Sequence, residues 1–323
     1  MALVNCRQLF PGAGGGGMIL ELSRCKPIVL KKIHFIINPA AGTEEPIISI
    51  IAAAFHNAAI PFVITESKAP GDIFNLVKAL RDTDNIVAVY GGDGTVMEAA
   101  RALHGSSTPL FIVPGGTANV MAKELNIPVD SEEAITMLVA GDYTIKTIDM
   151  GLVNGTPFLI RVNLGILSDM ITETDPEMKE KWGQWAYGLT AFQKLSKEGT
   201  LFHLTIDGEP YSEKAVALTI TNAGNIGREG YSFLPGISVN DGMLDVISMS
   251  DANLWSLLKV TGSMLFQKDS ELLNHRQAKE ITIRGDGNLH FLCDDKEQTA
   301  AELKIRISPA SLNVAVPKTK DNA

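Results

Sequence analysis

A glycine-rich turn between a strand and a helix limits how this chain can fold more than any other feature. The apolar run 86–90 is typical of a buried strand, and residues 96–103 have the apolar spacing of a helix. Between the two stand Gly91, Gly92, Asp93, Gly94 and Thr95. Backbone N–H groups at a helix start are unsatisfied and carry partial positive charge. The strand–glycine–helix unit therefore predicts a phosphate-binding turn in an α/β sheet.

Asp93 is the unexpected residue of this turn. A carboxylate repels a phosphate, so a simple phosphate cradle would not hold one at its centre. A Mg²⁺ ion, or a proton to be removed from a nucleophile, would give Asp93 a role. The alternative is an ordinary Asp-Gly turn that links strand to helix. The two glycines before Asp93 and the Gly94-Thr95 pair after it favour the phosphate site.

The pattern around the turn predicts two domains. Strand-like runs at 33–37, 62–65, 86–90 and 110–113 alternate with helical spacing at 47–59, 72–80, 96–103 and 120–125. This alternation predicts a mostly parallel sheet with helices on both faces. After about Asp149 the chain changes to short β-type segments, which predict an antiparallel sandwich or barrel. We therefore expect a flexible extension (1–30), an α/β domain (31–150), a β-sandwich domain (151–317) and a short tail (318–323).

Small and hydroxyl-bearing residues follow several of the predicted strands. These are Asn38, Pro39, Ala40, Ala41 and Gly42 after the first strand, residues 91–95 after the third, and residues 115–119 after the fourth. Thr65, at the end of the second strand, adds a hydroxyl group. Since ligands bind at the carboxyl ends of parallel strands, the sequence predicts one shared nucleotide site.

Bulk composition excludes some functions. The formal net charge of -9 argues against a broad nucleic-acid surface, because phosphate backbones attract an excess of Lys and Arg. Cys6, Cys25 and Cys293 are few, odd in number and far apart, which fits a reducing cytoplasm. No stretch has the run of about 18 apolar residues that a membrane span needs. We expect a cytoplasmic protein whose contact with the inner membrane surface is peripheral.

Four segments together resemble the diacylglycerol kinase catalytic-domain family, which includes soluble bacterial lipid kinases and the sphingosine and ceramide kinases. The segments are Asn38-Pro39-x-x-Gly42, the turn 91–95 with Glu98 after it, residues 114–119, and residues 240–245 (Asn-Asp-Gly-Met-Leu-Asp). They occur in the family's order and spacing. The resemblance covers roughly residues 31–317, and the joint match is far more specific than any single motif.

The resemblance implies an ATP-dependent lipid kinase. The implied fold is an α/β nucleotide-binding domain of the NAD-kinase type followed by a β-sandwich domain that takes the lipid, with the active site in the cleft between them. ATP and Mg²⁺ are the implied cofactors. Matching motifs assign these residues to the ATP site: Asn38, Pro39, Ala40, Ala41, Gly42, Thr65, Gly91, Gly92, Asp93, Gly94, Thr95, Val96, Met97 and Thr117.

The segment 240–245 resembles the family's metal loop in the second domain. There the Asp241 carboxylate would hold Mg²⁺ together with backbone oxygens of Ser238 and Met243. Oxygen ligands suit this hard ion. Without the resemblance, Asn240-Asp241-Gly242 would be interpreted as a common β-turn.

The chain departs from the family near its C-terminus, where a second catalytic carboxylate is expected. Bacterial members usually carry Asp-Gly-Glu, whose Glu is proposed to take the proton from the lipid hydroxyl. Here residues 293–298 are Cys-Asp-Asp-Lys-Glu-Gln. An ungapped count puts Lys296 at the Glu position, and a slip of one residue puts Glu297 there. We assign Asp93 and Glu297 as catalytic, with Asp294 as the next candidate and Asp93 acting alone as a further option.

An apparent copy of the Asp-Gly-Glu motif occurs earlier in the chain. Residues 207–210 read Asp-Gly-Glu-Pro. They lie between two strand-like runs, so a hairpin turn is the favoured interpretation.

Two other functions remain open from the sequence. NAD kinases share the Gly-Gly-Asp-Gly-Thr turn and a similar two-domain plan, although residues 114–119 and the C-terminal pattern favour the lipid branch. A non-catalytic nucleotide or lipid sensor of the same fold is the other, because residues 294–297 are altered. The lipid and the oligomeric state, for which a homodimer is one option, stay open.

Overall fold

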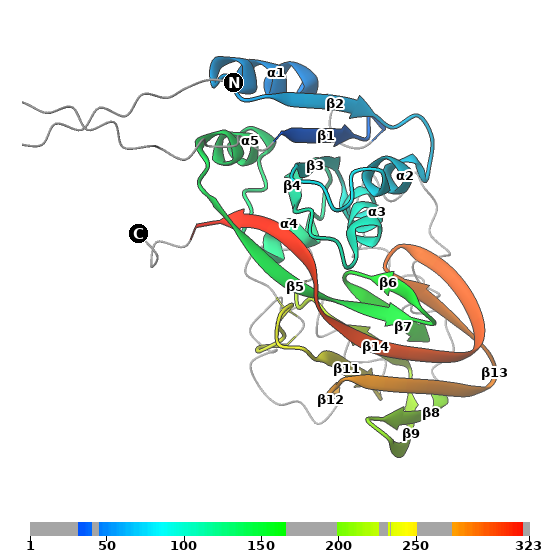
Figure 1. The fold of residues 1–323 in the computed structure, drawn as a ribbon. Helices are drawn as coiled ribbons and strands as arrows, with labels where there is room; N and C mark the ends of the chain where they lie inside the picture. Colours follow the sequence, from blue (N-terminus) through cyan, green and yellow to red (C-terminus); the bar gives the residue numbers. More distant parts are fainter. Residues whose placement is uncertain are drawn as a thin grey trace, which may run out of the picture.

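The computed structural model describes residues 32–40, 45–165, 199–225, 232, 234–250 and 273–318. The first half is a parallel sheet with strand order β2-β1-β3-β4 and helices packed around it (Figure 1). Its strands are β1 (Ile33–Ile37), β2 (Phe62–Glu66), β3 (Ile86–Gly91) and β4 (Leu110–Pro114). Its helices are α1 (Ile47–Asn57), α2 (Asp72–Lys78), α3 (Asp93–Leu103), α4 (Val120–Glu124) and α5 (Ser131–Ala140).

Burial explains why the central strands have uninterrupted apolar sequences. Every residue of β3 and of β4 is buried, as expected for parallel strands covered on both faces. Phe35 of β1 packs edge-on against Phe55 of α1, with ring centroids 5.1 Å apart. Local signals set the helix ends: at α5, Asp130 accepts a hydrogen bond from the Glu133 N–H (2.9 Å), and Gly141 ends the helix at φ 71°.

The second half is built from antiparallel strands, with order β12-β11-β10-β7-β13-β14. One face of this sheet carries the apolar core of the second half, which includes Val162, Ile220 and Phe291. The predicted fold class, an α/β domain followed by a β-sandwich domain, is confirmed. The strands are β5 (Tyr143–Val153), β6 (Thr156–Phe158), β7 (Arg161–Gly165), β8 (Thr200–Ile206), β9 (Glu209–Ala215), β10 (Ala217–Thr221), β11 (Leu244–Met249), β12 (Leu273–Ala278), β13 (Glu280–Cys293) and β14 (Lys296–Pro317).

Two long strands, β5 and β14, join the halves. They pair with each other in antiparallel register from Ile305↔Val153 to Pro317↔Tyr143, and β14 also pairs with β13. At its far end β14 meets β4 in parallel through Val314↔Leu110. Hydrogen bonding therefore continues from the second half into the first, and Figure 1 shows both strands crossing between them.

Several elements differ from the sequence prediction. The sequence predicts separate short strands at 281–283 and 289–291, and at 303–307 and 312–316. Each pair forms one long strand, β13 or β14, because a β-bulge carries the strand through the polar residues between them. Strand β5 was not predicted, since residues 143–147 are polar or only partly buried. The predicted hairpin at 207–210 is confirmed: Asp207 and Gly208 turn with φ 49° and 91° between β8 and β9. Within the described ranges, no helix is long and apolar enough to cross a membrane.

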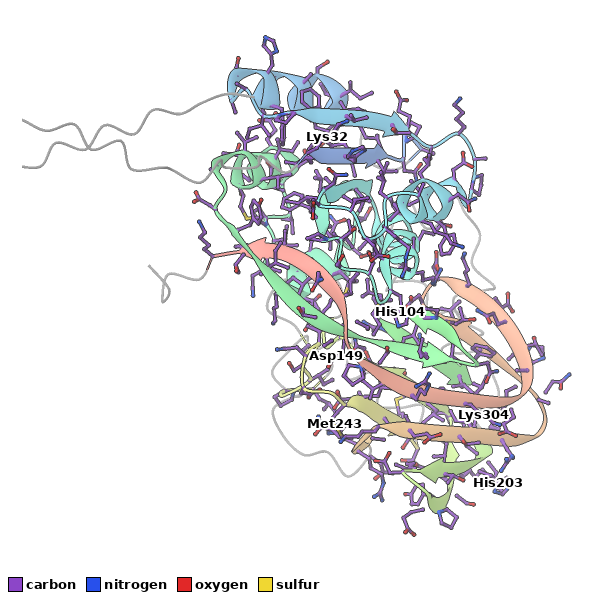
Figure 2. All side chains as sticks on the ribbon, in the orientation of Figure 1. Lys32, His104, Asp149, His203, Met243 and Lys304 are labelled. Atoms are coloured by element: carbon purple, nitrogen blue, oxygen red, sulfur yellow. The ribbon has the colours of Figure 1, made fainter. Side chains whose placement is uncertain are left out.

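Asp149 of β5 ties three backbone segments together at the junction of the two halves (Figure 2). Its side chain is buried; Oδ1 accepts from the Ala310 N–H and Oδ2 from the Gly242 N–H, each at 2.7 Å. Its carbonyl oxygen accepts from Asn222 Nδ2 at 2.9 Å. A single carboxylate thus fixes the loop 238–243 against the bulge of β14.

We expect Asp149→Ala to lower the free energy of unfolding by about 3 kcal/mol, because two backbone N–H groups lose the buried carboxylate that accepts their hydrogen bonds. Urea denaturation measures the change. The control is Asp142→Ala, since Asp142 is 71% exposed and only 4.0 Å from Lys318, a surface pair worth about 0–1 kcal/mol. Equal losses in the two variants would contradict the role given to Asp149.

Candidate active site

The ends of β1, β3 and β4 meet at one edge of the parallel sheet. Asn38, just after β1, donates from Nδ2 to Thr95 Oγ1 at 3.1 Å. Its backbone N–H donates to the Tyr90 carbonyl at 3.1 Å, and the Gly115 N–H donates to the Gly91 carbonyl at 2.9 Å. The structure therefore brings together the three turns that the sequence singled out.

Two glycines allow the turns after β3 and β4 to touch. A Cβ on Gly116 would lie 2.6 Å from the Gly92 Cα, closer than real Cβ atoms approach backbone. A Cβ on Gly92 would in turn lie 3.5 Å from the Gly116 Cα, so the two turns meet backbone to backbone. Without side chains here, the backbone at the start of α3 stays open to a ligand, whereas the N–H groups of Gly115 and Gly116 already donate to the Gly91 carbonyl and to Asn119 Oδ1.

Asp93 is the first residue of α3 and lies between the two turns. Its Oδ1 accepts a 2.7 Å hydrogen bond from the N–H of Val120, the first residue of α4. Burial raises the pKa of Asp93, while the hydrogen bond from Val120 opposes that increase. Asp93 thus links the start of α3 to the start of α4. An Asp-Gly turn that only connected a strand to a helix would not make this contact.

Asn119, the last residue of the predicted turn 115–119, closes that turn before α4. Its φ is 47°, and its side chain accepts from the Gly116 N–H (3.1 Å) and donates to the Gly116 carbonyl (2.8 Å). This arrangement leaves Thr117 exposed at the tip of the turn.

The remaining predicted ATP-site residues lie in different surroundings. Val96 and Met97 have side chains in the apolar core, so only their backbone is available to a ligand. Thr65 is half-buried on β2, opposite Ile36 of β1. Pro39 and Ala40 are exposed, whereas Ala41 and Gly42 lie outside the described residues.

The turn between β13 and β14 docks on α3. Cys293 pairs with Lys296, so Asp294 and Asp295 form a two-residue turn. Arg101 of α3 reaches it through Nη2, which lies 3.3 Å from Asp294 Oδ2 and 3.4 Å from Asp295 Oδ1. Lys296 Nζ lies 3.8 Å from Glu98 Oε1. Charged side chains of the second half thereby contact helix α3.

Asp294 has a structural role. Its side chain is fully buried, and its carboxylate accepts from the N–H groups of Leu159 (3.0 Å), Ile160 (2.9 Å) and Arg161 (3.1 Å). Arg101 supplies the compensating charge. Burial raises the pKa of Asp294, and the Leu159 bond and Arg101 oppose the increase. A carboxylate enclosed in this way is not accessible to a substrate hydroxyl.

Glu297, the favoured second catalytic carboxylate, is exposed and pairs with Leu292 across β13 and β14. Side chains alternate between the two faces of a strand, so Glu297 points to the face opposite Lys296. Since Lys296 is the residue that reaches α3, Glu297 does not face Glu98.

Arg161 supplies a positive charge that sequence reasoning missed. Its Nη2 donates to the Asn225 carbonyl at 2.7 Å, and the Asn225 N–H donates to Glu124 Oε2 at 2.7 Å. Burial lowers the pKa of Arg161 to about 10, and the charges of Asp294, Asp93 and Glu124 oppose that decrease. A single Arg at the start of a strand belongs to no motif, so the sequence did not predict that Arg161 lies near the site.

The loop 238–243 has a donor set that fits Mg²⁺. Asp241 is exposed; Oδ1 accepts from the Met243 N–H at 3.0 Å and Oδ2 from Gln277 Nε2 at 3.3 Å. A carboxylate has about four acceptor sites, so coordination capacity remains. Among the described residues, no group of three or more His, Cys, Asp or Glu side chains could hold a metal. Backbone oxygens such as those of Ser238 and Met243 would have to complete the site.

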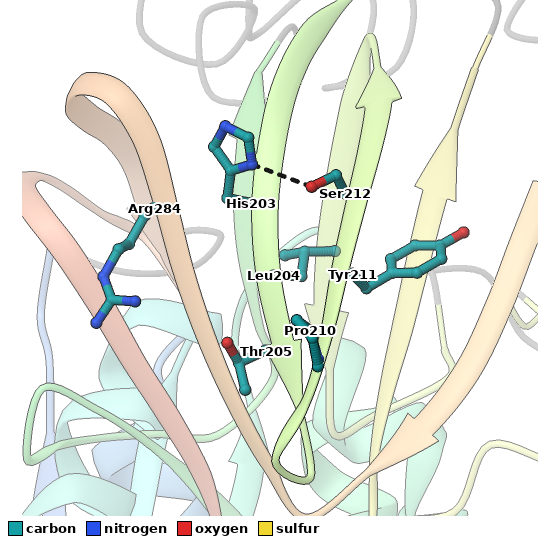
Figure 3. A pocket seen from close by; sticks show the side chains of 7 residues that line it. All are labelled: His203, Leu204, Thr205, Pro210, Tyr211, Ser212 and Arg284. Carbon is teal, nitrogen blue, oxygen red and sulfur yellow. Dashed lines mark hydrogen bonds between the residues drawn. The ribbon is translucent and has the colours of Figure 1, made fainter.

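A shallow cavity of about 300 Å³ lies elsewhere, on the β8–β9 hairpin (Figure 3). His203, Ser212 and Arg284 are among its lining residues. Arg284 already pairs with Glu302 at 3.1 Å, and none of the lining residues belongs to the three turns. We therefore do not assign the cavity to the phosphate site.

Two family models match the chain in succession. The diacylglycerol kinase catalytic domain matches residues 32–153. The YegS C-terminal NAD kinase beta sandwich-like domain matches residues 162–316. The first match contains all three glycine-bearing turns, and the second contains the loop 238–243 and the β13–β14 turn.

Named relatives and a solved structure agree with these matches. A diacylglycerol kinase of Bacillus subtilis is 30% identical over 72% of this chain and 78% of its own length. A diacylglycerol kinase of Mycobacterium tuberculosis is 28% identical over 75% of this chain and 80% of its own. The crystal structure of a diacylglycerol kinase from Bacillus anthracis superposes with a TM-score of 0.75 at 25% identity, covering 89% of this chain and 97% of that one.

We expect Gly116→Ala to weaken nucleotide binding at least about tenfold and to lower the free energy of unfolding by about 1–3 kcal/mol, because the added methyl group displaces the turn after β3. Calorimetric titration with ATP and urea denaturation measure the two effects. Gly287→Ala is the matched control, because a Cβ there meets nothing within 4 Å. Unchanged nucleotide affinity in Gly116→Ala would contradict a site between these turns.

Proposed function

The chain belongs to the diacylglycerol kinase family of lipid kinases, and from this premise we propose that it transfers the γ-phosphate of ATP to a hydroxyl group of a diacylglycerol-like or sphingoid lipid. One observation carries the proposal: two glycine turns touch at the start of α3, and Asp93 lies between them. A lipid hydroxyl would be presented at a membrane surface, where the protein binds peripherally.

We propose that ATP phosphates bind to backbone N–H groups at the start of α3 and to that of Thr117 in the turn after β4. Asn38 and Thr95 support the first turn through their hydrogen bond, and Asn119 supports the second. Arg161 adds positive charge near Asp93. The adenosine part would extend toward Thr65 and residues 38–42.

Phosphoryl transfer asks the protein mainly to position the reactants and to balance charge. We propose that Asp93 orients the lipid hydroxyl or a metal ion bound to the phosphates. The second half would contribute a further carboxylate from the turn region 294–297, where the sequence analysis favoured Glu297. Mg²⁺ would be held by Asp241 with backbone oxygens of Ser238 and Met243, and it would neutralise phosphate charge when bound.

Two alternative functions, an NAD kinase and a non-catalytic sensor, have to be tested beside the lipid kinase activity. The C-terminal family model is named for its likeness to the NAD kinase sandwich, so NAD must be tested as a phosphate acceptor. A non-catalytic sensor would bind ATP or lipid without turnover. The named relatives favour a lipid acceptor, because they are called diacylglycerol kinases.

We expect the wild-type protein to label a lipid with radioactive ATP when offered diacylglycerol, ceramide, sphingosine, phosphatidylglycerol and NAD. Asp93→Asn should lower kcat by about 10²–10⁴-fold, the usual contribution of a positioned acid or base. Because burial raises the pKa of Asp93, the acidic limb of the wild-type pH profile should lie above about pH 4, the ordinary range of an Asp.

The control for Asp93→Asn is Glu209→Gln, because Glu209 is exposed on the β8–β9 hairpin. Wild-type turnover in Asp93→Asn would remove Asp93 from the mechanism. Labelling of NAD in place of lipid would contradict the lipid assignment, and ATP binding without any turnover would support the sensor.

We expect Mg²⁺ to raise the melting temperature of the wild-type protein, because a ligand that binds only the folded state stabilises it. Asp241→Asn should lose most of this shift, since the amide removes the charged ligand. Glu209→Gln again serves as the control. A full Mg²⁺ shift in Asp241→Asn would contradict the assignment of the loop 238–243.

A further inference from the structure

One face of α3 matches the β13–β14 turn residue by residue. Gly94, Glu98 and Arg101 are four and three residues apart and so share a face of the helix. Asp295 lies next to Gly94, Lys296 pairs with Glu98, and Arg101 pairs with Asp294 and Asp295. Each of these ion pairs joins opposite charges. The face of α3 formed by Gly94, Glu98 and Arg101 therefore fixes the position of the β13–β14 turn relative to the start of the helix.

Gly94 lets the Asp295 carboxylate reach the first turn of α3. A Cβ built on Gly94 would lie 3.2 Å from Asp295 Oδ2, a tight contact that a larger side chain would convert into a clash. Gly94 directly follows Asp93 in the phosphate turn. The Asp295 side chain is 40% exposed, whereas that of Asp294 is fully buried, so Asp295 is accessible to a substrate.

The other carboxylates near the start of α3 either hold hydrogen bonds and ion pairs or lie on the opposite face of their strand. Asp294 is enclosed by three backbone N–H groups and Arg101. Glu98 faces Lys296. Glu297 lies on the strand face opposite Lys296. Asp295 is the acid of the turn that combines exposure with proximity to Asp93.

We infer that Asp295 is the carboxylate which the second half contributes to phosphoryl transfer, and this inference rests on the proposed function. Asp295 accepts the proton of the lipid hydroxyl as the hydroxyl oxygen bonds to the γ-phosphorus. The bond between that phosphorus and the β–γ bridging oxygen breaks, and ADP leaves with its electron pair. Because the transition state is loose, this step needs a well-placed proton acceptor more than a strong base.

Arg101 is the positioning residue for Asp295. Its side chain is only 8% exposed, its Nε donates to the Pro157 carbonyl at 3.3 Å, and its Nη2 is shared between Asp294 and Asp295. Because Nε and Nη2 are both held by hydrogen bonds, the guanidinium restricts where the Asp295 carboxylate can lie. Lysine has no planar fork and cannot reproduce these contacts.

The test compares Asp295→Asn with Glu297→Gln in the radiolabelled ATP and lipid assay. We expect Asp295→Asn to lower kcat by about 100-fold or more with little change in the KM for ATP, because a proton acceptor is lost while nucleotide contacts remain. Asp295→Glu keeps a carboxylate and should retain more activity than Asp295→Asn. Glu297→Gln should lose less activity than Asp295→Asn. The surface control Glu209→Gln should keep kcat within about threefold of wild type, a change worth less than 1 kcal/mol.

Folding is checked by melting temperature, which we expect to be unchanged in Asp295→Asn and lowered in Asp294→Asn. Arg101→Lys should lower kcat more than it raises KM. Wild-type kcat in Asp295→Asn, or a loss found only in Glu297→Gln, would overturn the inference and leave the lipid kinase activity standing. Failure of the wild-type protein to label any lipid would instead contradict the proposed function and this inference with it.

Discussion

The Arg101–Asp294 ion pair is the interaction on which the geometry of the site depends. Both side chains are buried, at 8% and 0% exposure, and the residues are 193 positions apart in the chain. Removing one partner of such a pair typically costs about 3–5 kcal/mol, because the remaining charge stays buried. The three N–H groups of residues 159–161 share the Asp294 carboxylate, so the pair also fixes the start of β7. Helix α3 and the second half thereby hold one relative position.

That fixed position has a chemical consequence. The start of α3 offers unsatisfied N–H groups to a phosphate. Carboxylates beside a bound phosphate need a compensating charge, because like charges repel. Arg101 lies beside Asp295 and Arg161 lies near Asp93, so cations from both halves accompany the two carboxylates. Because the chain has no lysine in the glycine turn itself, we attribute the positive charge of the proposed reaction to these arginines, the helix starts and a metal ion.

The parts of the fold that follow from local patterns could be predicted from the sequence. The four parallel strands and the glycine turns depend on nearby residues, such as the run 86–90 and Gly91. Contacts across long sequence distances could not be predicted. Counting residues along the chain could place either Lys296 or Glu297 at the position of the family's catalytic Glu. In the structure Cys293 pairs with Lys296 across the turn, and the Lys296 side chain extends toward Glu98 of α3. Arg161 and Asp149 gave no signal, because each acts through backbone groups far along the chain.

The central claim is that the phosphates of ATP bind where the turns after β3 and β4 touch. A crystal structure with Mg²⁺ and a non-hydrolysable ATP analogue tests it most directly. The account predicts β- and γ-phosphate oxygens within about 3.2 Å of backbone nitrogens of Gly92, Gly94 or Thr117, the usual hydrogen-bond distance. It also predicts the γ-phosphate on the side of α3 that faces Asp295. Phosphates bound elsewhere, for example in the cavity on the β8–β9 hairpin, would contradict it.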